Sequence, residues 1–288
     1  MRDPKAPLYT DNSDQRPFDK RGVMENLAIA PRSTFADIRF VLTDMDETLT
    51  YRGRMSARTY DALERLQSAG IHVIPVTAAP AGWCDQMARM WPVDGVIGEN
   101  GGLFFRRDGE HGLARRYWHG DADREDVHDR LLEIADQVRA RVPSAQWADD
   151  QAFRLTSIAF AHSADADASG AIVAALHAAG ARTTINNLWI LGWLGDYDKL
   201  AMTRRVMAEN YGIDIETGRD VILYCGDSIN DAPMFAFFRH TIGVSTVRDY
   251  LAGIPVAPAW VAAGPGGDGF VEAANAVLAA RDFKEHSF

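Results

Sequence analysis

Short apolar segments of strand length alternate with amphipathic helical segments between residues 36 and 98. The runs Ile38–Thr43 and Ile71–Thr77 contain β-branched residues and are typical of buried strands. The elements expected here are a strand at 38–43, a helix between Ser56 and Gly70, a strand at 71–77, a helix at about 81–91 and a strand at 95–98. Ser56 can cap the first helix and Gly70 can end it. This order of elements predicts a parallel, doubly wound sheet.

The alternation changes between Phe104 and Gly195. This stretch predicts a long helix at about 123–141, an alternating segment at 153–160, a helix at about 168–179 and strands at 183–186 and 188–194. Strands joined by tight polar turns favour a small α+β unit with an open antiparallel sheet. We therefore expect residues 104–195 to form an inserted α+β cap domain.

The first pattern returns after residue 195. It predicts a helix at about 199–210, a strand at 221–225, a helix at about 232–238, a strand at 241–244 and a helix at about 269–280. The predicted fold class is α/β, with a Rossmann-like doubly wound parallel-sheet core made of residues 34–103 and 196–288. Residues 1–33 mix acidic and basic side chains with prolines and show no periodicity, so we expect a flexible N-terminal tail.

Composition and charge narrow the classes of partner. The chain of 288 residues has 40 acidic and 30 basic side chains, a net charge of −10, which argues against DNA or RNA as a partner because their binding depends on lysine and arginine. Two cysteines are too few for a disulfide framework. No apolar run is long enough to span a bilayer and no secretory signal is evident, so we expect a cytoplasmic protein without a membrane partner.

Candidate chemistry gathers where the predicted parallel strands end, which is where open α/β sheets bind ligands. The sequence Asp44-Met-Asp-Glu-Thr48 follows the first strand, and Gly226-Asp-Ser-Ile-Asn-Asp231 follows a later one. One acidic strand end is more often a solvated turn, but two that meet at one edge would repel each other unless a cation lay between them. Hard oxygen ligands of this kind favour Mg²⁺, with substrate phosphate completing its shell.

The motifs resemble those of the haloacid dehalogenase superfamily of phosphatases. The order is Asp-x-Asp-x-Thr at 44–48, Thr77, Lys199 and Gly-Asp-Ser-x-Asn-Asp at 226–231, and the resemblance covers about residues 36–280. An insertion between the Thr77 and Lys199 motifs resembles the type II (C2) cap of this family. Glu99-Asn-Gly-Gly102 and Gly264–Phe270 look like the subgroup with the IIB form of that cap. This subgroup includes Mg²⁺-dependent phosphatases for sucrose phosphate and mannosyl-3-phosphoglycerate.

The resemblance implies a role for each motif residue. Asp44 would be the nucleophile that forms an aspartyl-phosphate, and Asp46 would act as general acid and then as general base. Asp44 and Asp227 would hold Mg²⁺, together with Asp46 through its backbone carbonyl. Asp231 would bind the metal through water or orient Lys199.

The remaining motif residues would bind the transferring phosphoryl group. Thr77 would do so through its hydroxyl and Lys199 through its charge, and Asn230 could complete this phosphate site. The implied substrate is a small phosphorylated metabolite, with a sugar phosphate favoured. Association into an oligomer stays open.

Three features leave questions open. Glu47 stands where the family usually has glycine, which leaves substrate access open although Asp44, Asp46 and Thr48 are all present. The cap has ten arginines, including Arg115, Arg116 and Arg154, and no lysine. We expect most of them to be solvated, although one or two could meet an anionic part of a substrate. Asn186 and Asn187 are most simply a turn, but they could reach sugar hydroxyls if that turn faces the core.

Two other functions are compatible with the sequence. A phosphomutase or phosphotransferase resembling phosphomannomutase would pass the phosphoryl group to another sugar hydroxyl instead of to water. A regulator that binds a metal or sugar phosphate without catalysis would need only the fold. The motif Gly-Asp-Ser-x-Asn-Asp looks more like that of the hydrolases than that of the mutases. The presence of Asp44, Asp46, Lys199 and Asp227 argues against the regulator, because a binding protein needs neither a nucleophile nor an acid.

Overall fold

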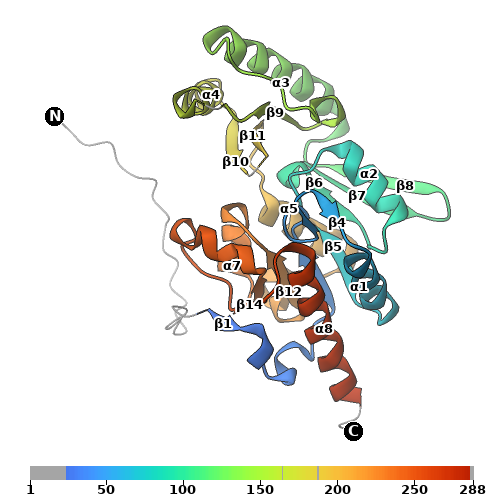
Figure 1. Ribbon diagram of the computed structural model, residues 1–288. Helices are drawn as coiled ribbons and strands as arrows, with labels where there is room; N and C mark the ends of the chain where they lie inside the picture. The colour runs from blue at the N-terminus through green and yellow to red at the C-terminus, as the bar shows by residue number, and fades with distance from the viewer. Residues whose placement is uncertain (1–23, 164, 187, 286–288) are drawn as a thin grey trace.

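A parallel sheet of six strands forms the core of the fold (Figure 1). The computed structural model describes residues 24–163, 165–186 and 188–285. The strands in spatial order are β1 (Glu25–Asn26), β14 (Trp260–Val261), β13 (His240–Gly243), β12 (Ile222–Gly226), β2 (Phe40–Thr43) and β5 (His72–Pro75). All neighbouring pairs run parallel. The predicted α/β class and its parallel sheet are confirmed.

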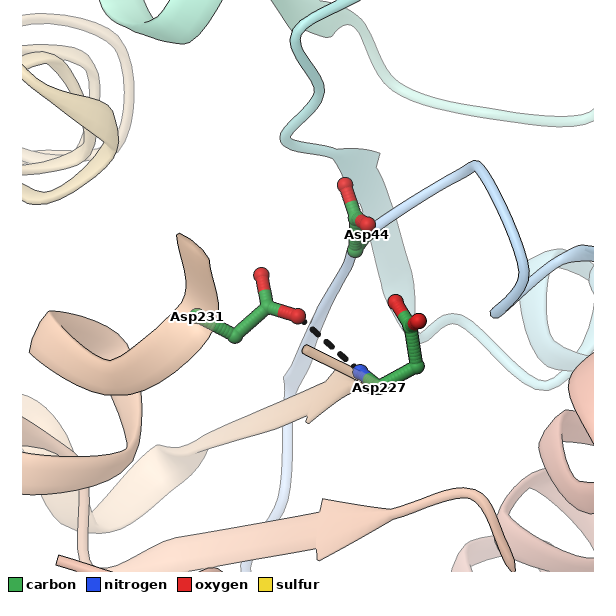
Figure 2. Close-up of side chains that lie close together, drawn as sticks. All are labelled: Asp44, Asp227 and Asp231. Atoms are coloured by element: carbon green, nitrogen blue, oxygen red, sulfur yellow. Dashed lines mark hydrogen bonds between the residues drawn. The ribbon is translucent and has the colours of Figure 1, made fainter. Parts of the chain in front are cut away.

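The point where the strand order changes direction lies between β2 and β12. From β2 the chain moves to β5 on one side, whereas from β12 it moves to β13 on the other. Asp44 follows β2, Asp227 follows β12, and the amide of Asp44 donates to the carbonyl of Cys225 at 2.9 Å. The two aspartates therefore stand at the same edge of the sheet, as Figure 2 shows.

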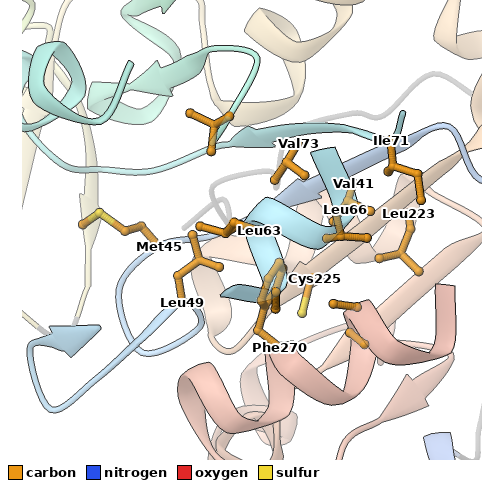
Figure 3. Close-up of a cluster of buried hydrophobic side chains, with 14 of the residues drawn as sticks. Val41, Met45, Leu49, Leu63, Leu66, Ile71, Val73, Leu223, Cys225 and Phe270 are labelled. Carbon is orange, nitrogen blue, oxygen red and sulfur yellow. The ribbon is translucent and has the colours of Figure 1, made fainter. Parts of the chain in front are cut away.

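Successive residues of β2 point to opposite faces of the sheet, as the pleat of a strand requires. Val41 packs on one face, against helices α1 (Ala57–Ser68), α2 (Ala81–Met90) and α8 (Gly266–Glu285), as in Figure 3. Phe40 and Leu42 pack on the other face, against α5 (Lys199–Tyr211) and α7 (Ala232–Phe237). Helices on both faces confirm the doubly wound arrangement.

The inserted segment contains an antiparallel sheet of three strands covered by two helices. Its strands in order are β10 (Arg182–Ile185), β11 (Trp189–Trp193) and β9 (Ser157–Ala161), and its helices are α3 (Asp121–Arg141) and α4 (Ala166–Ala178). Ile190 packs beneath the two helices, whereas its neighbour Leu191 packs with Ala78 and Tyr197 outside the cap. The expected α+β insertion is confirmed, and its second sheet face is turned toward the core.

A β-hairpin that the sequence patterns did not predict follows the first half of the core. It consists of β7 (Leu103–Asp108) and β8 (Gly112–Tyr117), and it pairs with β6 (Val96–Gly98) in an antiparallel sheet. The strand expected at 95–98 therefore belongs to this sheet, and a single parallel bridge between Val76 and Ile97 links it to the core. The hairpin escaped prediction because its distal half is charged and exposed.

The N-terminal segment differs in part from the expected tail. Residues 1–23 of that predicted tail lie outside the described residues. Beyond them, β1 pairs with Trp260 and Val261, and Leu27 is buried in the core.

Further short elements are β3 (Thr50–Tyr51), β4 (Arg54–Met55), α6 (Ile215–Gly218) and the 3₁₀ segments Leu27–Ile29, Arg32–Phe35, Glu99–Gly101, Gln151–Phe153, Arg219–Val221, Ile229–Asp231 and Ser245–Gly253. None of the described helices has the length and apolarity needed to cross a membrane.

Glu47 and Gly101 are two of the backbone positions near the carboxyl edge that have a positive φ. Glu47, in the loop after β2, has a φ of 56°, in the left-handed region where glycine is unstrained. Its amide donates to the hydroxyl of Thr50 at 3.1 Å. Gly101 has a φ of 108°, and a Cβ there would lie 2.3 Å from the backbone oxygen of Asp198. The turn at Gly101 thus packs directly on the residue that precedes Lys199.

Substitution of Gly101 by alanine should destabilise the protein. The added methyl group would meet the Asp198 backbone while φ stays positive, and a cost of about 2 kcal/mol or more is expected in urea unfolding. Gly170→Ala is the matched control, because Gly170 lies in α4 with open space around its Cβ position. That change should be neutral or stabilising by about 0.5 kcal/mol. Equal stabilities of the two variants would contradict the close packing.

Substitution of Glu47 by glycine should be tolerated. Glycine relieves a left-handed strain of about 1–2 kcal/mol, while its extra freedom in the unfolded chain offsets about 0.5–1 kcal/mol of that gain. Urea unfolding should therefore show a change within about 1 kcal/mol, whereas the β-branched Glu47→Val should cost more, about 1–3 kcal/mol. A large loss in Glu47→Gly would mean that the glutamate side chain itself stabilises the loop.

Candidate functional site

Three buried aspartates converge at the carboxyl edge of β2 and β12. Asp44, Asp227 and Asp231 each bring one carboxylate oxygen within 4.8 Å of the other two (Figure 2). Asp44 comes from the loop after β2, and the other two come from the loop and 3₁₀ turn after β12. All three are at most 6% exposed. The sequence predicted that these residues would lie together, and the fold brings them together because parallel strands end at one edge.

Lys199 lies between two of these carboxylates. Its Nζ donates to Asp44 Oδ1 at 2.8 Å and to Asp231 Oδ1 at 2.9 Å, and the lysine is 5% exposed. It is the first residue of α5, whose start is fixed by Asp198, which accepts a hydrogen bond from the amide of Ala201 at 2.7 Å. The helix cap therefore determines where this buried ammonium stands.

The Asp231 carboxylate is fully engaged by the protein. Besides Lys199, Oδ1 accepts the Tyr224 hydroxyl at 2.5 Å, and Oδ2 accepts the amides of Asp227 and Ser228 at 2.9 and 3.1 Å. Four hydrogen bonds occupy the lone-pair positions that a carboxylate offers. Of the two roles considered for Asp231, this arrangement favours the orientation of Lys199 over metal binding through water.

Asp227 differs because one of its oxygens has no partner. Oδ1 accepts the hydroxyl of Thr48 at 3.2 Å, whereas the buried Oδ2 has no hydrogen bond within the described part of the chain. A buried carboxylate oxygen without a partner is unfavourable and requires an explanation. A hard divalent cation between Asp44 and Asp227 would provide one, because carboxylate oxygens are ligands that Mg²⁺ prefers.

Burial and mutual repulsion shift the titration of these groups. Burial, and then the charge of Asp231, raises the pKa of Asp44 to about 7 against the opposing effect of Lys199. Burial and the charges of Asp231 and Asp44 raise the pKa of Asp227 to about 9. Burial tends to lower the pKa of Lys199, but Asp231 and Asp44 outweigh it and raise that pKa above its usual value. The site thus holds a permanent ammonium among carboxylates that need a further positive charge to ionise together.

The other predicted site residues lie at different depths. Asp46 and Asn230 line a cavity of about 20 Å³ together with Asp44, Asp227 and Lys199. Burial, opposed most strongly by Lys199, raises the pKa of Asp46 to about 6. Among the residues described, the cavity is lined by Ala78 rather than by its neighbour Thr77, which is fully buried and accepts the amide of Ala79 at 3.0 Å. Asn230 accepts the hydroxyl of Thr184 from strand β10 at 2.7 Å, which joins the core to the insertion.

The inserted sheet closes over this cavity. Asn186, in the turn between β10 and β11, lines it, so the turn faces the core. Its Oδ1 accepts the amides of Leu188 and Trp189, which confirms a turn. Asn187, considered with it, lies outside the described residues. Arg154 is 3% exposed and pairs with Asp150. It therefore differs from the solvated arginines that were expected to predominate in the cap.

Glu99 connects the two parts of the molecule. This carboxylate is 1% exposed and accepts five hydrogen bonds of 2.7–3.0 Å. The donors are the amide of Ala81 at the start of α2 and groups of Leu155, Thr156 and Ser157 at the start of β9. One side chain therefore ties a core helix to the first strand of the insertion.

Sequence reasoning missed several of these contacts. Tyr224 lies in an apolar strand, and its signal was a hydroxyl that must find a partner once buried. Thr48 was given no separate role in the first motif, yet its hydroxyl donates to Asp227. Glu99 was noted only as part of the Glu99–Gly102 motif, because its partners at Thr156 and Ser157 lie far along the chain. The pairing of Asp150 with Arg154, four residues on, also escaped the sequence patterns.

Comparison with known proteins agrees with this geometry. A family model for haloacid dehalogenase-like hydrolases matches residues 41–137. A phosphoglycolate phosphatase from Methanoculleus marisnigri is 28% identical over 239 residues, covering 82% of this chain and 95% of that protein. The chain is also similar to the solved structure of a Thermoplasma acidophilum protein, with a TM-score of 0.66, 20% identity and coverage of 84% and 99%.

A second solved structure shares the fold. It is a Bacteroides thetaiotaomicron protein described among phosphatases of the haloalkanoate enzyme superfamily, with a TM-score of 0.56, 18% identity and coverage of 93% of this chain and 100% of that one. At these identities the structural matches show the fold alone. The chain thus resembles haloacid dehalogenase-like hydrolases in its six-stranded parallel core, its inserted antiparallel sheet, the family match over residues 41–137 and the curated relative.

Proposed function

We propose that the chain is a Mg²⁺-dependent phosphomonoester hydrolase that works through an aspartyl-phosphate on Asp44. One observation carries this proposal. Asp44 is held by Lys199 beside Asp227, whose Oδ2 has no partner within the described residues. A nucleophile, a fixed ammonium and a vacant carboxylate oxygen in one small cavity suit the transfer of a phosphoryl group.

The residues present fit a bound Mg²⁺ ion. Asp44 and Asp227 would hold it through their carboxylates and Asp46 through its backbone carbonyl, while Asp231 keeps Lys199 in position. When bound, the cation supplies the positive charge that polarises the phosphoryl group and allows the neighbouring carboxylates to ionise. Lys199 would contact phosphoryl oxygens, and Asn230 would border the same site. Thr77, which does not line this cavity, would contact a phosphoryl oxygen only after the turn at Ala78 moves.

The chain's own residues account for both half-reactions. An oxygen of Asp44 attacks phosphorus while the bond from phosphorus to the leaving oxygen breaks, and Asp46 donates its proton to that oxygen. Asp46 then accepts a proton from water as the water attacks phosphorus, which releases phosphate and frees Asp44. The pKa of about 6 at Asp46 suits both roles, because the group can hold and release a proton near neutral pH.

The proposed substrate is a small phosphorylated metabolite, with a sugar phosphate favoured. The resemblance to the type IIB subgroup with its sucrose-phosphate and mannosyl-3-phosphoglycerate phosphatases supports this choice. We further propose that residues 34–103 and 196–288 act as the catalytic core and that the insertion at 104–195 acts as the cap. The paired hairpin β7–β8 makes the first part of that insertion an extension of the core.

Loss of the proposed nucleophile should abolish turnover. Asp44→Asn should release no inorganic phosphate from a panel of phosphorylated metabolites, and EDTA should abolish release by the unchanged protein. Asp46→Asn should retain the site but lose about 10²–10⁴-fold in kcat. Asp149→Asn, at an exposed position, controls for the loss of one charge. Isomerisation of a hexose phosphate without phosphate release would favour a phosphomutase, and tight binding without any turnover would favour a regulator.

Magnesium should stabilise the fold more at alkaline than at acid pH. The pKa of Asp227 is raised in the folded state, so its contribution to metal-free stability is full below its unfolded pKa of about 4 and is lost as pH rises toward 9. Mg²⁺ competes with protons for the same oxygens, so its effect on Tm should be larger at about pH 8 than at about pH 6. A Mg²⁺ concentration of about 100 times Kd should raise the free energy of unfolding by about 2.7 kcal/mol. Asp227→Asn should remove the effect, and a Tm unchanged by Mg²⁺ at both pH values would contradict the metal site.

A further inference from the structure

A second small cavity adjoins Asp46, and Asp44 and Asp227 do not line it. It measures about 40 Å³ and is bordered by Asp46, Asp150, Arg154, Asn186 and Trp189, among others. Asp46 also lines the cavity that contains Asp44 and Asp227. A leaving group that takes its proton from Asp46 would therefore extend into this second cavity. The space suits about three water-sized groups, which corresponds to a short leaving group.

Among the described residues that border this cavity, Arg154 is the only cationic one, and it is already paired. Arg154 Nε donates to Asp150 Oδ1 at 2.9 Å and Nη2 donates to Oδ2 at 2.7 Å, a bidentate contact with both oxygens. Nη1 donates to the carbonyl of Ala78 at 3.1 Å and to the hydroxyl of Ser157 at 3.3 Å. The side chains of Arg154 and Asp150 are 1% and 11% exposed. The guanidinium therefore has no pair of N–H groups free for a bidentate contact with an anionic group of a substrate.

The charge balance of the cavity follows from this pair. Asp150 neutralises Arg154, and Asp46 adds a further acidic group. A carboxylate on the leaving group would bring another negative charge, and it could reach Arg154 only by displacing Asp150. Asp150 would then stay buried and lose the hydrogen bonds from Arg154. The Trp189 indole N–H, at 3.1 Å, would be the one side-chain donor that it keeps. Such a buried, unpaired carboxylate is strongly unfavourable.

A hydroxyl group meets better partners in the same place. The Asp150 carboxylate accepts three hydrogen bonds from Arg154 and Trp189, and a carboxylate has about four acceptor positions. The Asn186 side-chain amide nitrogen donates to no group in the described part of the chain, since only its Oδ1 is engaged, by Leu188 and Trp189. One acceptor and one donor thus remain available for an alcohol.

We propose that the Asp150–Arg154 pair selects phosphoesters whose leaving group is uncharged and carries a hydroxyl, and rejects those whose leaving group carries a carboxylate. This inference rests on the proposed phosphatase function. It separates this chain from its curated relative, which is named for phosphoglycolate, an ester whose leaving group carries a carboxylate. Asp150 is accordingly a specificity residue that acts by occupying Arg154.

The test uses two substrates with matched two-carbon leaving groups, 2-hydroxyethyl phosphate and phosphoglycolate. The full-length protein with Mg²⁺ should show a kcat/KM about 100-fold or more higher for 2-hydroxyethyl phosphate, because the two differ in the charge that meets Asp150. A kcat/KM for phosphoglycolate that equals or exceeds the value for 2-hydroxyethyl phosphate would overturn the inference. This comparison needs no variant, so it holds whether or not a variant folds.

Variants locate the effect. Asp150→Asn frees the charge of Arg154 and should reduce the preference for the hydroxyl substrate by about 10-fold or more, mainly by raising kcat/KM for phosphoglycolate. Asp149→Asn removes the same charge one residue away, at an exposed position, and should leave the preference within about 2-fold. An unchanged preference in folded Asp150→Asn would contradict the assignment of this residue.

A third substrate distinguishes failure of the inference from failure of the proposed function. Hydrolysis of ethyl phosphate that depends on Mg²⁺ and Asp44 reports the phosphatase activity alone, because its two-carbon leaving group matches the other two in length and carries neither a hydroxyl nor a carboxylate. If that activity is present and phosphoglycolate is preferred, only the inference falls. If the protein hydrolyses no phosphoester, the proposed function falls and the inference with it.

Discussion

The ammonium of Lys199, held between Asp44 and Asp231, is the interaction on which the site depends. Three carboxylates buried at one edge of the sheet would repel one another, and burial alone already disfavours their charge. The lysine offsets part of that charge and fixes the direction of both carboxylates it touches. Within the described residues Asp227 has no such partner for its second oxygen, and the proposed cation would balance the site. The stability of the site and the proposed chemistry therefore depend on the same balance of charge among the lysine and the three carboxylates.

The rest of the fold serves to keep that lysine and its partners in place. The start of α5 is fixed by its Asp198 cap, and Gly101 allows another turn to pack against the same backbone. Glu99 then ties a core helix to the insertion through five hydrogen bonds. The inserted sheet and its turn bring Trp189 and Asn186 to the cavity that Asp46, the proposed acid, also lines. Residues of the core and of the insertion, joined through Glu99, thus line the two small cavities that share Asp46.

Much of this arrangement could be predicted from the sequence, and the missing part has a physical reason. Strands such as 38–43 and 71–77 were evident because burial on both faces leaves an apolar run, and motif order then placed Asp44 and Asp227 at one edge. The hairpin β7–β8 was missed because its exposed half has no apolar periodicity. The pairing of Arg154 with Asp150 was missed because burial and charge compensation are properties of packing, and a solvated arginine has the same local sequence.

The account's central claim is that Asp44 becomes covalently phosphorylated during turnover. The most direct test is to quench the protein during steady-state hydrolysis, reduce it with borohydride and locate the modified residue by peptide mass spectrometry. An acyl phosphate at residue 44 is reduced to homoserine, so the account predicts homoserine at that position only in samples that contain substrate and Mg²⁺. Continued turnover with an unmodified Asp44, or with the modification at another residue, would contradict it.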